Sequence, residues 1–261
     1  AYNLSLLGEK AVVLASAGSD YAAYRKWQIV NRIDVSRVHV VPKERTAAAY
    51  IMTDKADNQI TGFHPGALQH RFQISNFKFQ KLARTVRFAI VSPGNNDDMR
   101  ALPVLCKKYH VPYIYDPGQE IPRLSKKDLI DGMTGAKAVI MNDYELAMAQ
   151  KKTRLTKQQI LARTEILVTT LGEKGSVIEI QNSEFRIQNY RIPAVRPKKV
   201  VDPTGAGDAY RAGFIYGLLR GWPLPKIGRF AGALAVYTVE KKGTQTHRCT
   251  VRDIIRRSAK T

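Results

Sequence analysis

The residues best suited to chemistry lie in one segment, Val200–Gly221, with the sequence VVDPTGAGDAYRAGFIYGLLRG. Pro203 ends any preceding strand because its ring removes the backbone N–H. After it, Gly205, Ala206 and Gly207 offer closely spaced N–H groups with little side-chain bulk at the start of a predicted helix. Such N–H groups, aided by the helix dipole, form a binding site for a phosphate group.

Asp208 follows this loop and lies in the first turn of the predicted helix. In one interpretation it only complements the helix dipole, and the glycines only make a turn. In the other, its carboxylate accepts a proton from an attacking hydroxyl while the N–H groups hold the transferring phosphoryl group. A Walker A loop is absent from the sequence, and a dinucleotide GxGxxG loop would need glycine where Tyr210 stands.

The segment DPTGAGDAYRAGF resembles the C-terminal signature of the ribokinase/PfkB family of carbohydrate and nucleoside kinases. That signature reads Asp-Thr-x-Gly-Ala-Gly-Asp, with one position variable. The resemblance favours the catalytic interpretation. It implies that Asp208 is the general base and that the amides of Gly205, Ala206 and Gly207 form an anion hole.

The segment VIMNDYELA places Asn142 and Glu145 three residues apart after a predicted buried strand. This spacing puts both side chains on one helix face, where they could hold water around Mg²⁺ or form a capping box. The family's Asn-x-x-Glu motif implies the magnesium role. Asp202 and Thr204 resemble a loop that binds a monovalent cation such as K⁺ in some members, with Thr204 also beside the nucleotide.

Two further segments resemble the nucleotide-binding parts of the family. In VTTLGEKGS, the residues Thr170, Gly172 and Gly175 are similar to a Thr-x-Gly-x-x-Gly loop that touches ATP, although a plain hairpin turn would have the same composition. FAGALAVYTVEKKGTQTH resembles the helix and loop that enclose the adenine, although a closely packed helix would also use small residues. The small residues there are Ala231, Ala235 and Gly243.

The acceptor side looks more like the archaeal and bacterial adenosine (nucleoside) kinase branch, on the segments TDKADNQITGFHPGA and YDPGQEIPRL. Asn58 and Gln59 are expected either in a lid over the sugar or in a turn. The resemblance thus implies ATP- and Mg²⁺-dependent phosphorylation of the hydroxymethyl group of a nucleoside such as adenosine. A ribokinase- or fructokinase-type sugar substrate is the alternative.

Apolar, β-branched runs alternate with helical stretches, which indicates an α/β fold with a largely parallel sheet. By resemblance, residues 1–261 form one ribokinase-like domain, a three-layer sandwich with a mostly parallel central sheet and a small β lid within about residues 45–66. Arg45–Gly66 reads as a hairpin that turns at Asp54–Asn58, and His70–Lys81 as a surface connection. The predicted strands are Ala11–Ala15, Val38–Val41, Ala47–Thr53, Phe88–Val91, Tyr113–Asp116, Ala138–Met141, Ile166–Thr170 and Ser176–Ile180.

The start of the sequence, AYNLSLLGEKAVVLASAG, predicts a helix over Tyr2–Leu7 that stops at Gly8. Family members open with a buried strand that carries a substrate-binding Asp. By resemblance, this chain begins inside the helix that follows, so we expect the N-terminal strand to be missing from it.

Composition bounds the remaining possibilities. With two cysteines and no CxxC pair in 261 residues, a disulfide scaffold and a Cys-based zinc site are excluded. The lack of a long apolar run or a leader pattern makes the cytoplasm the expected location and a membrane partner unexpected. The net charge of +20 predicts weak, non-specific nucleic-acid binding and leaves a rival open, a non-catalytic kinase-like protein that binds nucleic acid or an assembly. A homodimer is a further expectation.

Overall fold

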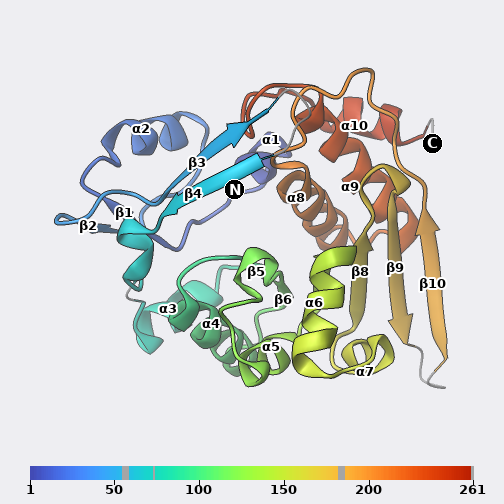
Figure 1. Cartoon of the computed structure of the whole chain (residues 1–261), viewed down its shortest axis with the longest axis horizontal. Coiled ribbons are helices and arrows are strands. Elements are labelled where there is room, and N and C mark those ends of the chain that lie inside the picture. Colours follow the sequence, from blue (N-terminus) through green and yellow to red (C-terminus); the bar gives the residue numbers. More distant parts are fainter. Residues whose placement is uncertain (55–58, 73, 182–185, 260–261) are drawn as a thin grey trace.

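A mixed sheet of six strands forms the centre of the chain, in the order β10-β9-β8-β7-β6-β5 (Figure 1). The computed structural model describes residues 1–54, 59–72, 74–181 and 186–259. β5 to β8 pair in parallel, whereas β9 and β10 are antiparallel to their neighbours, so the predicted mostly parallel sheet is confirmed. The strands are β5 (Ala89–Val91), β6 (Tyr113–Tyr115), β7 (Ala138–Asn142), β8 (Ile166–Thr170), β9 (Ser176–Gln181) and β10 (Ile187–Ile192).

The central strands are buried on both faces because their apolar residues alternate between two hydrophobic clusters. Tyr113, Tyr115 and Met141 belong to one cluster, and Ile114 and Ile140 to the other. Successive side chains of a strand point to opposite faces, so a continuous apolar run such as AVIM fills both clusters at once.

Helices cover each face of the sheet and complete the three predicted layers (Figure 1). Five of them contribute to the cluster around Tyr113: α3 (Asn76–Ala83), α4 (Asn96–Lys108), α5 (Lys126–Met133), α6 (Asp143–Thr153) and α7 (Lys157–Leu161). The cluster around Ile114 takes residues from α8 (Ala206–Leu219) and α9 (Leu224–Val239). These two pack tightly, since a β-carbon on Gly213 of α8 would lie 2.8 Å from the Cα of Ala231 of α9.

Two smaller sheets lie beside this sandwich (Figure 1). β1 (Ala15–Gly18) pairs in parallel with β2 (Val38–Val41), and the antiparallel pair β3 (Ala48–Thr53) and β4 (Gln59–His64) confirms the predicted hairpin. Most of the predicted turn, residues 55–58, lies outside the described residues. The remaining helices are α1 (Tyr2–Leu6), α2 (Ala22–Val30), α10 (Val251–Ser258) and the short 3₁₀ turns η1 (Gly66–Gln69), η2 (Gly118–Glu120) and η3 (Gly172–Lys174).

Two expectations about elements were wrong, and one strand was missed. The strand predicted at Ala11–Ala15 begins only at Ala15, with Val12 making an isolated bridge to Asp34. The supposed surface connection contains α3, which the Ser75 side chain caps by accepting the Lys78 N–H at 3.3 Å. The strand β10 was missed, because IQNYRI at the edge of the sheet is neither a continuous apolar run nor a regular polar–apolar alternation.

The N-terminal segment is helical as predicted, with α1 ending before Gly8, whose φ is +81°. The expectation that a family strand precedes it stays a prediction. No helix in the described part of the chain is long and apolar enough to cross a membrane.

Candidate active site

The carboxyl ends of the parallel strands bring three chemically capable residues to one edge of the sheet. Asp116 directly follows β6 and donates its N–H to the Val91 carbonyl at 2.9 Å. Asn142 ends β7 and lies opposite Thr170, which ends β8. Ligands in α/β proteins bind at this edge of the sheet, so the segments that follow β6, β7 and β8 define the candidate site.

The glycine-rich loop leads directly into α8, and Asp208 lies in the first turn of this helix, as the sequence predicts. Gly205 has a φ of +86° and precedes the first residue of α8, so Asp208 falls in the first helical turn with its side chain 70% exposed. Among the described residues, the N–H groups of Gly205 and Gly207 have no hydrogen-bond acceptor. The Ala206 N–H instead donates to the Pro203 carbonyl at 3.2 Å, so two of the three expected donors are free.

The carboxylate of Asp202 ties this loop to the segment after α9. Its Oδ1 accepts the Thr204 N–H at 2.9 Å, and its Oδ2 accepts the Gly243 N–H at 2.9 Å. The hydrogen bonds of Thr204 and Gly243 lower the pKa of Asp202 below its usual value. Both oxygens therefore have a structural partner, and the expected role in binding a monovalent cation stays a prediction.

Two residues that the sequence analysis did not assign complete the charged centre. Arg211 lies three residues after Asp208, and its Nη2 donates to Asp208 Oδ1 at 2.7 Å. Its Nε lies 3.0 Å from Oδ2 of Asp116, whose side chain is 1% exposed. The Asp–Arg pair at helical spacing was visible in the sequence, but the partner 95 positions away was not.

Asp116 is an unusual carboxyl group. Burial raises its pKa to about 7, although Arg211 opposes the rise, and the charges of Glu145 and Asp208 add to it. The contact with Arg211 is an ion pair without an aligned hydrogen bond, and neither carboxylate oxygen has a hydrogen-bond donor among the described residues. Arg211 contacts Asp116 and Asp208, and the charge of Glu145 acts on Asp116 and Arg211; we call these four residues the charged cluster.

Asn142 and Glu145 form the capping box that starts α6. The Asn142 N–H donates to Glu145 Oε2 at 2.8 Å, and the Glu145 N–H donates to Asn142 Oδ1 at 2.7 Å. Because equivalent capping boxes begin α5, α7 and α10, the spacing alone does not indicate a metal site.

Glu145 nevertheless offers an oxygen ligand of the kind that Mg²⁺ prefers. Among the described residues, no group of three or more His, Cys, Asp or Glu residues could hold a metal ion alone. Magnesium in kinases needs only one or two carboxylates, because it keeps several waters and binds the phosphates of the nucleotide. Glu145 can supply one such carboxylate, and its predicted role at a magnesium site stays a prediction.

The predicted nucleotide residues fall into two groups. The first group lies at the turn between β8 and β9 and consists of Thr170, Gly172 and Gly175. The space around Gly172 is open, whereas Gly175 lies against the backbone at Ile192. In the second group, Ala235 is partly buried and Gly243 begins the loop held by Asp202, but Ala231 is fully buried in the contact between α8 and α9. The structure thus gives Ala231 a packing role, and its predicted contact with a base stays a prediction.

The acceptor residues predicted in the lid are only partly described. Asn58 lies outside the described residues, and Gln59 is the first residue of β4. The hairpin exposes large apolar side chains, including Tyr50 and Ile60. Their exposure is consistent with a lid that covers a ligand, and the roles of Asn58 and Gln59 stay predictions.

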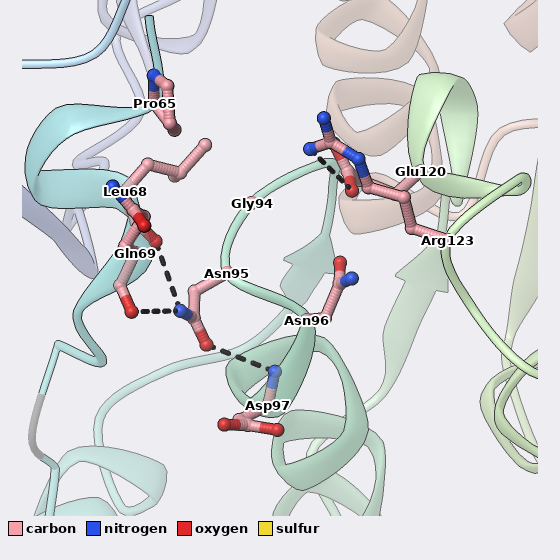
Figure 2. Close-up of a pocket in the computed structure, with 9 residues that line it drawn as sticks. All are labelled: Pro65, Leu68, Gln69, Gly94, Asn95, Asn96, Asp97, Glu120 and Arg123. Atoms are coloured by element: carbon pink, nitrogen blue, oxygen red, sulfur yellow. Dashed lines mark hydrogen bonds and ion pairs between the residues drawn. The ribbon is translucent and has the colours of Figure 1, made fainter.

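A polar cavity of about 250 Å³ lies between η1, the start of α4 and η2 (Figure 2). Asn95 fixes one wall, since its Nδ2 donates to the carbonyls of Leu68 and Gln69, each at 3.0 Å. None of the four residues of the charged cluster lines it. Its lining includes the charged side chains of Asp97, Glu120 and Arg123, and the cavity is separate from the glycine-rich loop.

Known proteins resemble this chain along most of its length. Residues 1–250 match the pfkB family of carbohydrate kinases. A nucleoside kinase of Methanocaldococcus jannaschii is 32% identical, with the match covering 100% of this chain and 83% of that protein. A nucleoside kinase of Methanothermobacter thermautotrophicus is 31% identical, over 93% of this chain and 77% of its own length.

Solved structures give the same picture. The Burkholderia thailandensis nucleoside kinase in complex with inosine superposes with a TM-score of 0.90 at 32% identity, covering 100% of this chain and 83% of that one. An Arabidopsis thaliana ribokinase complexed with ribose and ATP has a TM-score of 0.81 at 20% identity, over 99% of this chain and 85% of its own. The second likeness bears on the fold alone and confirms the ribokinase-like architecture.

Proposed function

This chain belongs to the pfkB family of carbohydrate kinases, and we propose that it transfers the γ-phosphoryl group of ATP to the hydroxymethyl group of a nucleoside. The observation that carries the proposal is the position of Asp208 beside the free N–H groups of Gly205 and Gly207. A carboxylate next to an anion site is what deprotonation of a hydroxyl during phosphoryl transfer requires.

The activities of the more similar relatives favour a nucleoside over a free sugar as the acceptor. Two archaeal relatives that match nearly the whole chain at 31–32% identity are nucleoside kinases, and a third, that of Burkholderia thailandensis, was solved with inosine. The Haemophilus influenzae ribokinase is only 24% identical. We therefore infer a purine nucleoside, adenosine-like in size, as the favoured substrate class.

In the reaction, Asp208 accepts the proton of the acceptor hydroxyl as its oxygen attacks the γ-phosphorus. A new P–O bond forms to the acceptor, the bond between the γ-phosphorus and the bridging oxygen breaks, and ADP leaves with that electron pair. The N–H groups of Gly205 and Gly207 donate to oxygens of the transferring group. We assign Thr170 and Gly172 to the nucleotide phosphates and Ala235 and Gly243 to its base.

We further infer that the nucleotide binds together with Mg²⁺, which neutralises charge on the phosphates when bound. Glu145, supported by Asn142, would hold its water ligands. The loop of Asp202 and Thr204 is proposed to bind a monovalent cation. A magnesium titration of Glu145→Gln tests the first role, and a comparison of turnover in K⁺ and in a large organic cation tests the second.

The test of the proposed function is ATP turnover with a panel of nucleosides and free sugars. We expect kcat/KM to be highest for a purine nucleoside. Asp208→Asn should lower kcat by ~10²–10⁴-fold while the affinity for a non-hydrolysable ATP analogue stays within about threefold, because a general base acts on the proton and not on the nucleotide.

Asp253→Asn is the matched control for this variant. Asp253 also stands in the first turn of a helix, α10, and pairs with an arginine three residues on at 3.0 Å. The control should keep normal turnover. Near-normal turnover of Asp208→Asn, or the absence of turnover with every acceptor in the unaltered protein, would contradict the proposal.

Two properties of the whole protein belong to the same proposal. We infer that the enzyme acts in the cytoplasm, because Cys106 and Cys249 are both free thiols, as is usual in a reducing compartment. The expected homodimer is checked by sedimentation analysis of the purified protein.

A further inference from the structure

The guanidinium of Arg211 lies directly against the glycine-rich loop. A β-carbon added to Gly207 would lie 3.3 Å from Nη1 of Arg211 and 3.5 Å from Nη2. The cation therefore lies beside Gly207, whose N–H group is one of the two free donors of the loop. A phosphoryl oxygen held there would come within reach of the guanidinium.

The donors of Arg211 are only partly used. Nη2 donates to Asp208 Oδ1 at 2.7 Å, whereas Nε lies 3.0 Å from Asp116 Oδ2 in an ion pair without an aligned hydrogen bond. Nη1 has no partner among the described residues. An arginine presents its donors in a rigid planar fork, so fixing two nitrogens also fixes the direction of the third.

Asp116 supplies the fixed end of this arrangement. Its side chain is 1% exposed, and its backbone N–H is held by Val91 at the end of the sheet. A buried charge is costly unless a partner compensates it, so Asp116 and Arg211 stabilise each other. The buried Asp116 therefore holds the guanidinium from the protein interior, while the exposed Asp208 contacts it from the solvent side.

We propose that Arg211 is a catalytic residue that binds the transferring phosphoryl group through Nη1, and that Asp116 is the positioning residue that holds Arg211 in place. The inference rests on the proposed kinase function. As the bond from the γ-phosphorus to ADP breaks and the bond to the acceptor oxygen forms, negative charge on the phosphoryl oxygens meets the guanidinium. Asp208 takes the hydroxyl proton, and Arg211 stays protonated throughout.

The first test separates the γ-phosphoryl group from the rest of the nucleotide. Titration calorimetry with Mg²⁺ compares the affinity of Arg211→Gln for ADP and for the β,γ-imido analogue of ATP. We expect the analogue to bind ~10-fold more weakly and ADP to change by less than about threefold, since only the analogue carries the group that Nη1 contacts. With the proposed nucleoside acceptor, kcat should fall ~10²–10³-fold.

Two further variants test the positioning role. Arg211→Lys keeps the charge but cannot contact Asp116 and a phosphoryl oxygen as a planar fork, so we expect an intermediate loss of analogue affinity. Asp116→Asn should show the same selective loss for the analogue over ADP, by ~3–10-fold, because the anchor of Arg211 is weakened. Arg256→Gln removes an exposed arginine from an equivalent pair on α10 and should change neither affinity.

The outcomes distinguish the alternatives. If Arg211→Gln lowered kcat but left both nucleotide affinities unchanged, Arg211 would only neutralise Asp208, and the proposal would be overturned. An equal loss for ADP and the analogue, or turnover within about threefold of normal, would also overturn it. Thermal melting shows whether each variant is folded, and the binding experiments need no acceptor, so their result does not depend on which nucleoside is phosphorylated.

Discussion

At the scale of single residues, His247 joins the start of the chain to the segment after α9. Its ring is fully buried, its Nε2 lies 2.7 Å from Asn3 Oδ1, and its carbonyl accepts the Tyr2 hydroxyl at 2.6 Å. Nδ1 is buried without a hydrogen-bond partner among the described residues. Because a second proton would have to sit on that nitrogen, burial lowers the pKa of His247 to about 4, and Arg248 adds to the effect.

This shift predicts how stability depends on pH. Between pH ~6.5 and pH ~4 the unfolded chain binds a proton at His247 that the folded protein does not bind, so the free energy of unfolding falls as the pH falls. His247→Gln should remove on the order of 1–3 kcal/mol of that dependence, as measured by urea unfolding at pH 7 and pH 5. The exposed His64→Gln is the control and should behave like the unaltered protein. An unchanged pH dependence in His247→Gln would show that another group is responsible.

The sequence was informative about Asp208 and the glycines, because their chemistry is local: a carboxylate, small residues and a helix start follow one another. It did not reveal the pair of Asp116 and Arg211. That pair forms only when β6 and α8 meet, and a single sequence contains no signal for which of its aspartates ends up buried beside an arginine. The spacing of Asn142 and Glu145 marked both residues in the sequence. It did not assign them one role, because a capping box has the same spacing as the proposed magnesium site.

At the scale of elements, the turn between β8 and β9 contains two glycines with different surroundings. Gly175 has a φ of +90°, and a β-carbon there would lie 2.0 Å from the Ile192 carbonyl oxygen. Gly172 has a φ of +57° and no atom within 4 Å of that position. Both adopt a conformation that side chains disfavour, but only Gly175 also meets the backbone of a neighbouring strand.

Alanine substitutions should therefore have unequal effects. Gly172→Ala should cost ~1–2 kcal/mol of stability, the strain of a left-handed residue. Gly175→Ala should cost more than about 3 kcal/mol or prevent folding, because β10 would have to move away from β9. Denaturant unfolding of the two proteins measures the difference. Equal losses would mean that the backbone contact at Gly175 is unimportant.

The central strands could be predicted because they are buried on both faces of the sheet. Runs such as AVIM and ILVTT contain enough apolar residues to identify β7 and β8 without knowledge of their partners. β10 and α3 expose more polar residues, and their identity depends on what they pack against. The sequence of β10, IQNYRI, has no regular polar–apolar alternation and becomes a strand only by pairing with β9.

At the scale of the whole molecule, the net charge of +20 is the feature that catalysis does not explain. We expect weak binding to random-sequence single-stranded DNA, with a Kd of ~10⁻⁴–10⁻⁶ M near physiological salt. Affinity should fall at least ~10-fold between 50 and 200 mM salt, because released counterions supply most of the binding free energy. Fluorescence anisotropy measures both quantities.

The opposite result would support the non-catalytic rival. Tight binding that survived ~0.5 M salt and discriminated between sequences would require contacts other than charge, and a nucleic-acid partner would then be the main ligand.

The charged cluster also has a consequence for how the protein refolds. Asp116, Glu145 and Asp208 are carried by segments that follow β6, β7 and the long excursion through β9 and β10. Parallel strands pair only through long crossover connections, and such distant contacts form slowly because loop closure must precede them. Helices such as α9 can form from local contacts well before that. After dilution from denaturant, enzyme turnover should accordingly recover more slowly than the helical circular dichroism signal. The recovery of activity therefore measures the rate of the last step of folding.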